Sequence, residues 1–241
     1  MHFVEREYLM GNFIRVFGSV AVLCAALFGA SLPARAVTID VDLGGQFQAD
    51  NDVFIVNFSL DSDRLVSFFT SSWISAGSGL GFDTALFLWD SAGNWLGFPS
   101  GYSDDVGLGG SALSNGISHA YGENDVFLNA FLGAGDYTAT LVQTGNLPVG
   151  FPGAAQLANG FNQAGSPNYT RDVYGWGPED FFNGAAGNDP RTGDWTFHMV
   201  GISDYTIPGA APIPEPATAT LLALGAAGCA LRHRRKDFQA N

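Results

Sequence analysis

The sequence has little charge and almost no cysteine or lysine. Charged residues make up 14% of its 241 positions, two cysteines occur, and Lys236 is the single lysine. So few cysteines exclude a disulfide-rich scaffold, and the absence of a Gly-x-y repeat excludes a collagen-like chain. Ten basic against 23 acidic residues leave no basic stripe that could hold phosphates. Nucleic acid is therefore not an expected partner.

The first basic residues flank an apolar segment near the start of the chain. Arg15 precedes an apolar run at 16–30, and Ala34 and Ala36 supply the small side chains that a signal peptidase recognises. This order predicts a secretory signal peptide over residues 1–36, cleaved after Ala36. A retained membrane anchor is the alternative, although the run is shorter than the roughly 20 residues needed to span a bilayer.

The last basic residues follow a second apolar segment. The motif Pro214-Glu215-Pro216 precedes an apolar stretch at 217–231, and the cluster at 232–236 contains three arginines, one histidine and one lysine. Proline prevents a helix from continuing into the body, and the cationic end favours the cytoplasmic side of a membrane. As a helix the stretch would rise about 23 Å, which suits a transient membrane association.

This C-terminal order resembles the PEP-CTERM sorting signal of exported bacterial proteins, over residues 212–236. The resemblance implies that the membrane enzyme exosortase cuts near the Pro-Glu-Pro motif. The body would then be delivered to the cell surface or to the extracellular polysaccharide matrix. An ordinary tail anchor is the alternative.

Residues 37–211 remain as the exported body, with 19 acidic residues, three arginines and no cysteine. Apolar and polar residues alternate at 53–60, and 83–90 forms an apolar run typical of a buried strand. The residues from Asp90 to Asn94 predict a hairpin turn, in which Gly93 takes a positive φ. No segment has a sustained helical period. The sequence therefore predicts an all-β, antiparallel sandwich.

Four segments of the body resemble the bacterial pre-peptidase C-terminal domain, and more closely a group of PEP-CTERM proteins that share its pattern. They are residues 50–54, 81–94, 103–105 and 135–138. The resemblance implies a jelly-roll-like sandwich and a non-catalytic accessory role in binding or secretion.

Residues 145–191 show no alternation and are rich in glycine, asparagine, proline and aromatic residues. Long irregular segments in compact domains tend to be functional or disordered, and the many aromatic residues argue against disorder. Either this insertion covers one sheet, or it presents rings that stack on sugars or on a partner protein. Tyr174 and Trp176 are the candidate binding residues.

The residues required for nucleophilic catalysis are mostly missing from the body, which has no cysteine, no lysine and no Gly-x-Ser-x-Gly motif. Its two histidines, His119 and His198, have strand-like surroundings, so a zinc site is not expected. We predict a non-enzymatic surface or matrix protein that binds polysaccharide or protein. Because glycoside hydrolysis needs only two carboxylates, a secreted glycoside hydrolase is the alternative, beside an accessory binding module.

Calcium is the cation that the sequence favours, although no cofactor is required. Hard cations bind several oxygen ligands, and Asp104 and Asp105 lie in a Gly-rich loop that Asp83 or Asp90 can approach. We therefore predict a Ca²⁺ site among these four aspartates. The alternative is that aspartate is frequent in turns and keeps an exported protein soluble.

Overall fold

Short segments of alternating polarity form the strands of the body. The computed structural model describes residues 37–73, 81–183 and 191–209. Sheet A has the strand order β1 (Ile39–Gln46), β10 (Asp194–Ile202), β3 (Arg64–Thr70), β8 (Phe127–Leu132). Sheet B has the order β11 (Asp204–Thr206), β2 (Val53–Leu60), β9 (Gly135–Gln143), β4 (Thr84–Asp90), β5 (Tyr102–Ser103). All pairs are antiparallel, so the predicted all-β, antiparallel architecture is confirmed.

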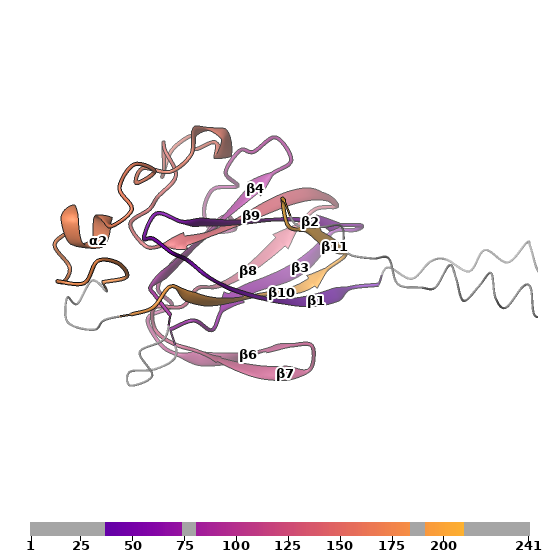
Figure 1. Ribbon diagram of the computed structural model, residues 1–241. Helices are drawn as coiled ribbons and strands as arrows, with labels where there is room; N and C mark the ends of the chain where they lie inside the picture. Colours follow the sequence, from indigo (N-terminus) through magenta and orange to yellow (C-terminus); the bar gives the residue numbers. More distant parts are fainter. Residues whose placement is uncertain (1–36, 74–80, 184–190, 210–241) are drawn as a thin grey trace, which may run out of the picture. The chain divides into compact units, whose positions relative to one another are not determined.

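The two sheets enclose the main core, as the layers of Figure 1 show. Alternate residues of each strand point inward: Val56, Phe58 and Leu60 of β2 and Val66 and Phe68 of β3 are all nearly inaccessible to solvent. Outside sheet A lies a hairpin of β6 (Gly110–Ser114) and β7 (Ile117–Tyr121). The fold is therefore a sandwich with a third, smaller layer against one sheet.

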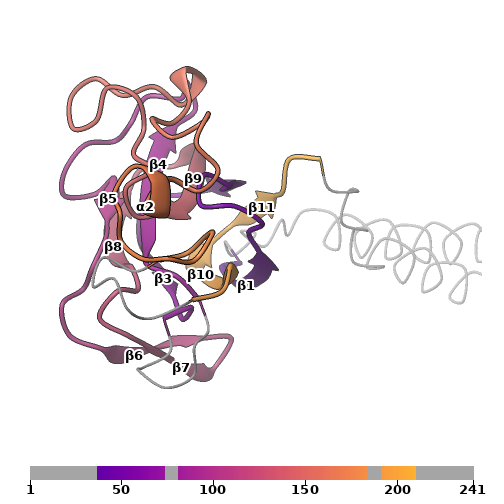
Figure 2. The same cartoon turned by 60° about the vertical axis from the view of Figure 1, so that its left-hand side comes forward.

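Strand β4 is buried on both faces, which explains its continuous apolar sequence. Leu86 and Leu88 belong to the core between the sheets, whereas Phe87 and Trp89 form a second cluster on the outer face of sheet B. Residues 145–183 supply the cover for this outer face and contain η1 (Leu157–Asn159) and α2 (Tyr169–Asp172). Figure 2 shows this segment beside β4 and β9.

The predicted signal peptide at 1–36 and the apolar stretch at 217–231 lie outside the described residues. Within the ranges that the structure describes, no helix is both long and apolar enough to cross a membrane.

Candidate functional site

Strand pairing brings three of the four predicted calcium ligands together. Asp83 directly precedes β4, and Asp104 and Asp105 directly follow β5. Leu86 pairs with Ser103 in an antiparallel ladder, so the start of β4 lies beside the end of β5. One carboxylate oxygen from each of the three aspartates lies within 4.8 Å of the others.

Burial and charge make this cluster unusual. Asp83 is only 4% exposed, and its Oδ1 is buried without a hydrogen-bond partner. Burial, followed by the charges of Asp104, Asp105 and Asp125, raises the pKa of Asp83 to about 9. Burial and the neighbouring charges of Asp104 and Glu123 also raise the pKa of Asp105. Because the pKa of Asp83 lies above neutral pH, this carboxyl group holds a proton there, which lowers the negative charge of the cluster.

Neighbouring hydroxyl groups orient the third ligand. Asp104 accepts hydrogen bonds from the Tyr102 hydroxyl (2.8 Å to Oδ2) and from the Thr144 hydroxyl (3.0 and 3.1 Å). Ca²⁺ binds carboxylate oxygens at about 2.3–2.6 Å, so two of its ligands can be up to about 5 Å apart. The spacing and the oxygen-only chemistry of the cluster therefore fit a hard cation.

Asp90, the fourth predicted ligand, does not belong to this cluster. It lies at the opposite end of β4 from Asp83, and its Oδ1 accepts hydrogen bonds from the backbone N–H groups of Ala92 (2.9 Å) and Asn94 (2.8 Å). These bonds lower the pKa of Asp90, with the side-chain bond from Asn94 contributing most. The role of Asp90 in the structure is to close the turn, which corrects the sequence-based assignment.

The predicted binding residues Tyr174 and Trp176 stack on one another, with ring centroids 4.6 Å apart and planes at 21°. Tyr174 is 40% exposed, and its hydroxyl donates to the Gly145 carbonyl oxygen at 3.2 Å. The two rings form a small aromatic surface on the insertion, with the edge of Tyr169 against Tyr174.

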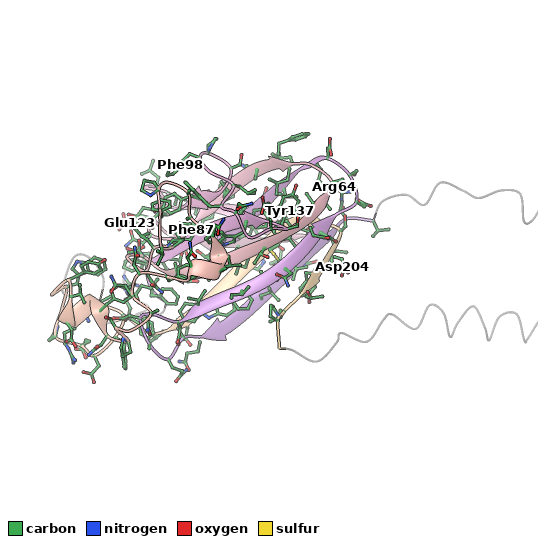
Figure 3. All side chains as sticks on the ribbon, turned by 90° about the horizontal axis from the view of Figure 1, so that it is seen from above. Arg64, Phe87, Phe98, Glu123, Tyr137 and Asp204 are labelled. Atoms are coloured by element: carbon green, nitrogen blue, oxygen red, sulfur yellow. The ribbon has the colours of Figure 1, made fainter. Side chains whose placement is uncertain are left out.

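A hollow of about 430 Å³, which sequence reasoning did not find, opens on sheet B. Its lining comes mainly from β11, β2 and β9 and includes Asp136, Tyr137 and Asp204, of which the last two are labelled in Figure 3. Asp204 and Asp136 pair with Ser59 from its two sides. Two strand spacings therefore separate their backbones, about 10 Å. The hollow offers hydroxyl and carboxylate groups over a shallow sheet surface.

The second group missed by sequence reasoning lies on the outer face of sheet A. The Oγ of Ser71 lies 2.9 Å from Nε2 of His198, and Nδ1 of His198 lies 2.6 Å from Oδ1 of Asp42. Burial, partly opposed by the hydrogen bond to Asp42, lowers the pKa of His198. Although burial opposes the change, hydrogen bonds from Ser114, His198 and Asn115 lower the pKa of Asp42 to about 2.

This order of serine, histidine and aspartate matches a nucleophile, a base and an orienting acid. The surroundings do not favour catalysis, because His198 is 0% exposed. In addition, the backbone N–H groups of Ser72 and Trp73 both donate to Oδ1 of Asp125, so they are not free to hold an oxyanion. No sequence motif links the three residues, since 156 positions separate Asp42 from His198.

The comparisons with known proteins concern the C-terminal segment alone. A family model described as the PEP-CTERM protein-sorting motif matches residues 212–236. No curated protein and no solved structure matches the chain. The motif indicates an exported, envelope-associated protein that exosortase processes. Its residues Pro214, Glu215 and Pro216, like the predicted cleavage residues Ala34 and Ala36, lie outside the described part of the chain.

Proposed function

We propose that this chain is a non-enzymatic protein of the bacterial cell surface or extracellular matrix. In this proposal signal peptidase removes residues 1–36 and exosortase acts near Pro214-Glu215-Pro216. The match of residues 212–236 to the sorting motif is the observation that carries the proposal. The buried His198 and the bonded N–H groups beside Ser71 support the absence of acyl-transfer chemistry.

A jelly-roll body of the pre-peptidase C-terminal type belongs to the same proposal. With the β6–β7 hairpin and β11 set aside, β1 and β3 lie in sheet A, whereas β2 and β4 lie in sheet B, and the return strands β8, β9 and β10 insert between or beside them. Such interleaving of two four-stranded sheets is typical of a double Greek key. A non-catalytic accessory role agrees with this architecture.

Calcium binding at Asp83, Asp104 and Asp105 is the second part of the proposal. The buried, unpartnered Oδ1 of Asp83 supports it, because a bound cation would supply the missing partner. The ion would tie the start of β4 to the loop after β5. It would also offset repulsion among three carboxylates.

Polysaccharide is the proposed external ligand of the body. Two surfaces are candidates: the stacked pair Tyr174 and Trp176, and the hollow with Asp136 and Asp204. A glycan array probed with the wild-type protein, Trp176→Ala and Asp136→Asn/Asp204→Asn tests both. We expect binding that one of the variants loses. Equal signals from all three proteins would contradict both surfaces, and release of sugar fragments would indicate a hydrolase instead.

The sorting step is tested in the host by the variant Pro214→Ala/Glu215→Ala. We expect this variant to accumulate in the membrane fraction, since exosortase would no longer process it, while wild-type protein reaches the surface. A matched control, Pro208→Ala, lies just before the motif and should be processed normally. Identical fractionation of the motif variant and the wild type would contradict the proposal.

A further inference from the structure

The β6–β7 hairpin places a histidine over two polar residues of sheet A. Asp42 of β1 and His198 of β10 are directly paired across the ladder. His119 of β7 approaches from the hairpin, and its ring centroid lies 4.2 Å from that of His198. Figure 1 shows the hairpin alongside β1 and β10. We propose that Asp42, His119 and His198 bind a divalent transition-metal ion such as Zn²⁺.

The donor set has the chemistry of such a site. Imidazole nitrogens and a carboxylate oxygen are ligands that Zn²⁺ binds in proteins, at about 2.0–2.2 Å. One ligand atom from each of the three residues lies within 4.8 Å of the other two. His119 comes from a two-stranded hairpin and is half-buried, so a small movement of the hairpin brings its nitrogen closer. Two imidazoles and one carboxylate would leave a coordination position for water.

An unsatisfied polar atom points to a missing partner. Nε2 of His119 is buried without a hydrogen-bond partner. A buried nitrogen in this state has lost its hydrogen bond to water without a replacement. The ring of His119 is tilted by 41° against that of His198, with the ring centroids 4.2 Å apart. A metal ion bound by the two neutral rings would give the unsatisfied nitrogen a partner.

The surrounding residues already orient the ligands. The hydroxyl of Ser71 lies 2.9 Å from Nε2 of His198, which leaves Nδ1 directed at Asp42. The side-chain amide of Asn115, at the hairpin turn, donates to Oδ2 of Asp42 at 2.8 Å. Such outer hydrogen bonds fix the orientation of metal ligands. On binding, the ion would take the place of the proton between Nδ1 and Oδ1, and His198 would stay neutral with its ring proton on Nε2, which would donate to the Ser71 hydroxyl.

The test measures Zn²⁺ binding to the full chain in mild detergent, by competition with a chromogenic chelator, and the absorption spectrum with Co²⁺. We expect one tightly bound ion per chain. His119→Phe keeps a ring against His198 but removes a ligand. It should therefore weaken Zn²⁺ binding by at least about 100-fold, which is more than the loss of an outer hydrogen-bond partner causes.

Two controls separate this site from other cation binding. The double variant His2→Ala/His233→Ala removes the other two histidines of the chain, and Asp104→Asn/Asp105→Asn removes the acidic cluster. Both should bind Zn²⁺ like the wild type. Unchanged binding by His119→Phe, no binding by the wild type, or loss of binding in either control would overturn the proposal.

Discussion

Among single residues, the buried aspartates have contrasting roles that depend on their partners. Asp50 is 0% exposed, and its carboxylate accepts hydrogen bonds from the N–H and hydroxyl of Thr170 (2.9 and 2.6 Å) and from the N–H of Phe182 (2.6 Å). It therefore fastens the insertion to the sandwich. Asp83 is also buried, but its Oδ1 has no hydrogen-bond partner. The difference separates a structural carboxylate from a candidate ligand.

We predict that Asp50→Asn lowers the free energy of unfolding by at least about 2 kcal/mol. An amide has only one acceptor oxygen, so a buried N–H or hydroxyl donor of Thr170 or Phe182 would lose its partner. Urea denaturation measures the loss. Asp172→Asn removes an exposed ion pair with Arg171 that solvent screens, so it should leave the stability nearly unchanged. Equal stability of the two variants would contradict this role of Asp50.

The contribution of Asp90 to the stability of the fold should depend on pH. Its folded-state pKa lies below its usual value. The carboxylate therefore stabilises the fold above about pH 4, and this contribution is lost as the pH falls through the folded-state pKa. Asp90→Ala should cost about 1 kcal/mol at pH 7 and progressively less below about pH 4. Thermal melts of both proteins between pH 7 and pH 3 measure the difference, and a constant gap would be inconsistent with the prediction.

At the scale of elements, local sequence patterns predicted the strands and turns that depend on residues close together in the chain. The alternation at 53–60 gave β2, the apolar run at 83–90 gave β4, and Gly93 has a φ of 78° in the turn that follows. The sequence did not predict the hairpin of β6 and β7, because its side chains alternate only weakly. It also did not predict the two long-range groups, since only sheet pairing brings Asp42 to His198, or Asp136 to Asp204.

The sequence predicted the acidic cluster only in part, because sheet pairing determines which of the aspartates lie together. Asp104 and Asp105 are neighbours in sequence, and Asp83 reaches them through the pairing of β4 with β5. Asp90 belongs to the same strand as Leu86, but the strand is extended, so its two ends cannot serve one ion. The sequence identified aspartates as candidate ligands, but the register of the strands determines which of these aspartates lie together.

The packing of β4 can be tested with one large side chain. Phe87 is 0% exposed beneath the insertion, and Phe98, on the neighbouring loop, is 60% exposed (Figure 3). Phe87→Ala should lower the free energy of unfolding by about 3–5 kcal/mol, since it leaves a cavity between the sheet and its cover. Phe98→Ala should cost about 1 kcal/mol or less. Denaturant titrations compare the two, and similar losses would refute the covering role of the insertion.

On the scale of the whole molecule, the body carries 19 acidic residues against three arginines. Such an excess keeps an exported protein soluble but destabilises the compact state through repulsion. With no cysteine in residues 37–211, no disulfide opposes that repulsion. Packing on both faces of sheet B stabilises the body against this repulsion. We propose that bound cations supply the rest of the stabilisation.

We therefore predict that Ca²⁺ raises the melting temperature of the protein. At 100 times the dissociation constant, a ligand of the native state adds about 2.7 kcal/mol. For a body of this size, that corresponds to roughly 5–10 °C. Differential scanning calorimetry with Ca²⁺ and with a chelator measures the shift.

The matched variant Asp83→Asn should abolish the calcium response. In chelator it should be about as stable as the wild type, because the pKa of about 9 keeps the buried Asp83 protonated near neutral pH, and an amide, like the neutral acid, carries no charge. A full calcium shift in this variant, or none in the wild type, would disprove binding at the acidic cluster.

Export followed by removal of both terminal segments is the central claim, and the intact mass of the protein isolated from the surface of its host tests it most directly. We predict a species that begins at Val37, lacks residues 217–241 and has an added group or a free end near Pro214-Glu215-Pro216. A cell-associated species that keeps both the first 36 residues and the arginine-rich end would contradict the claim.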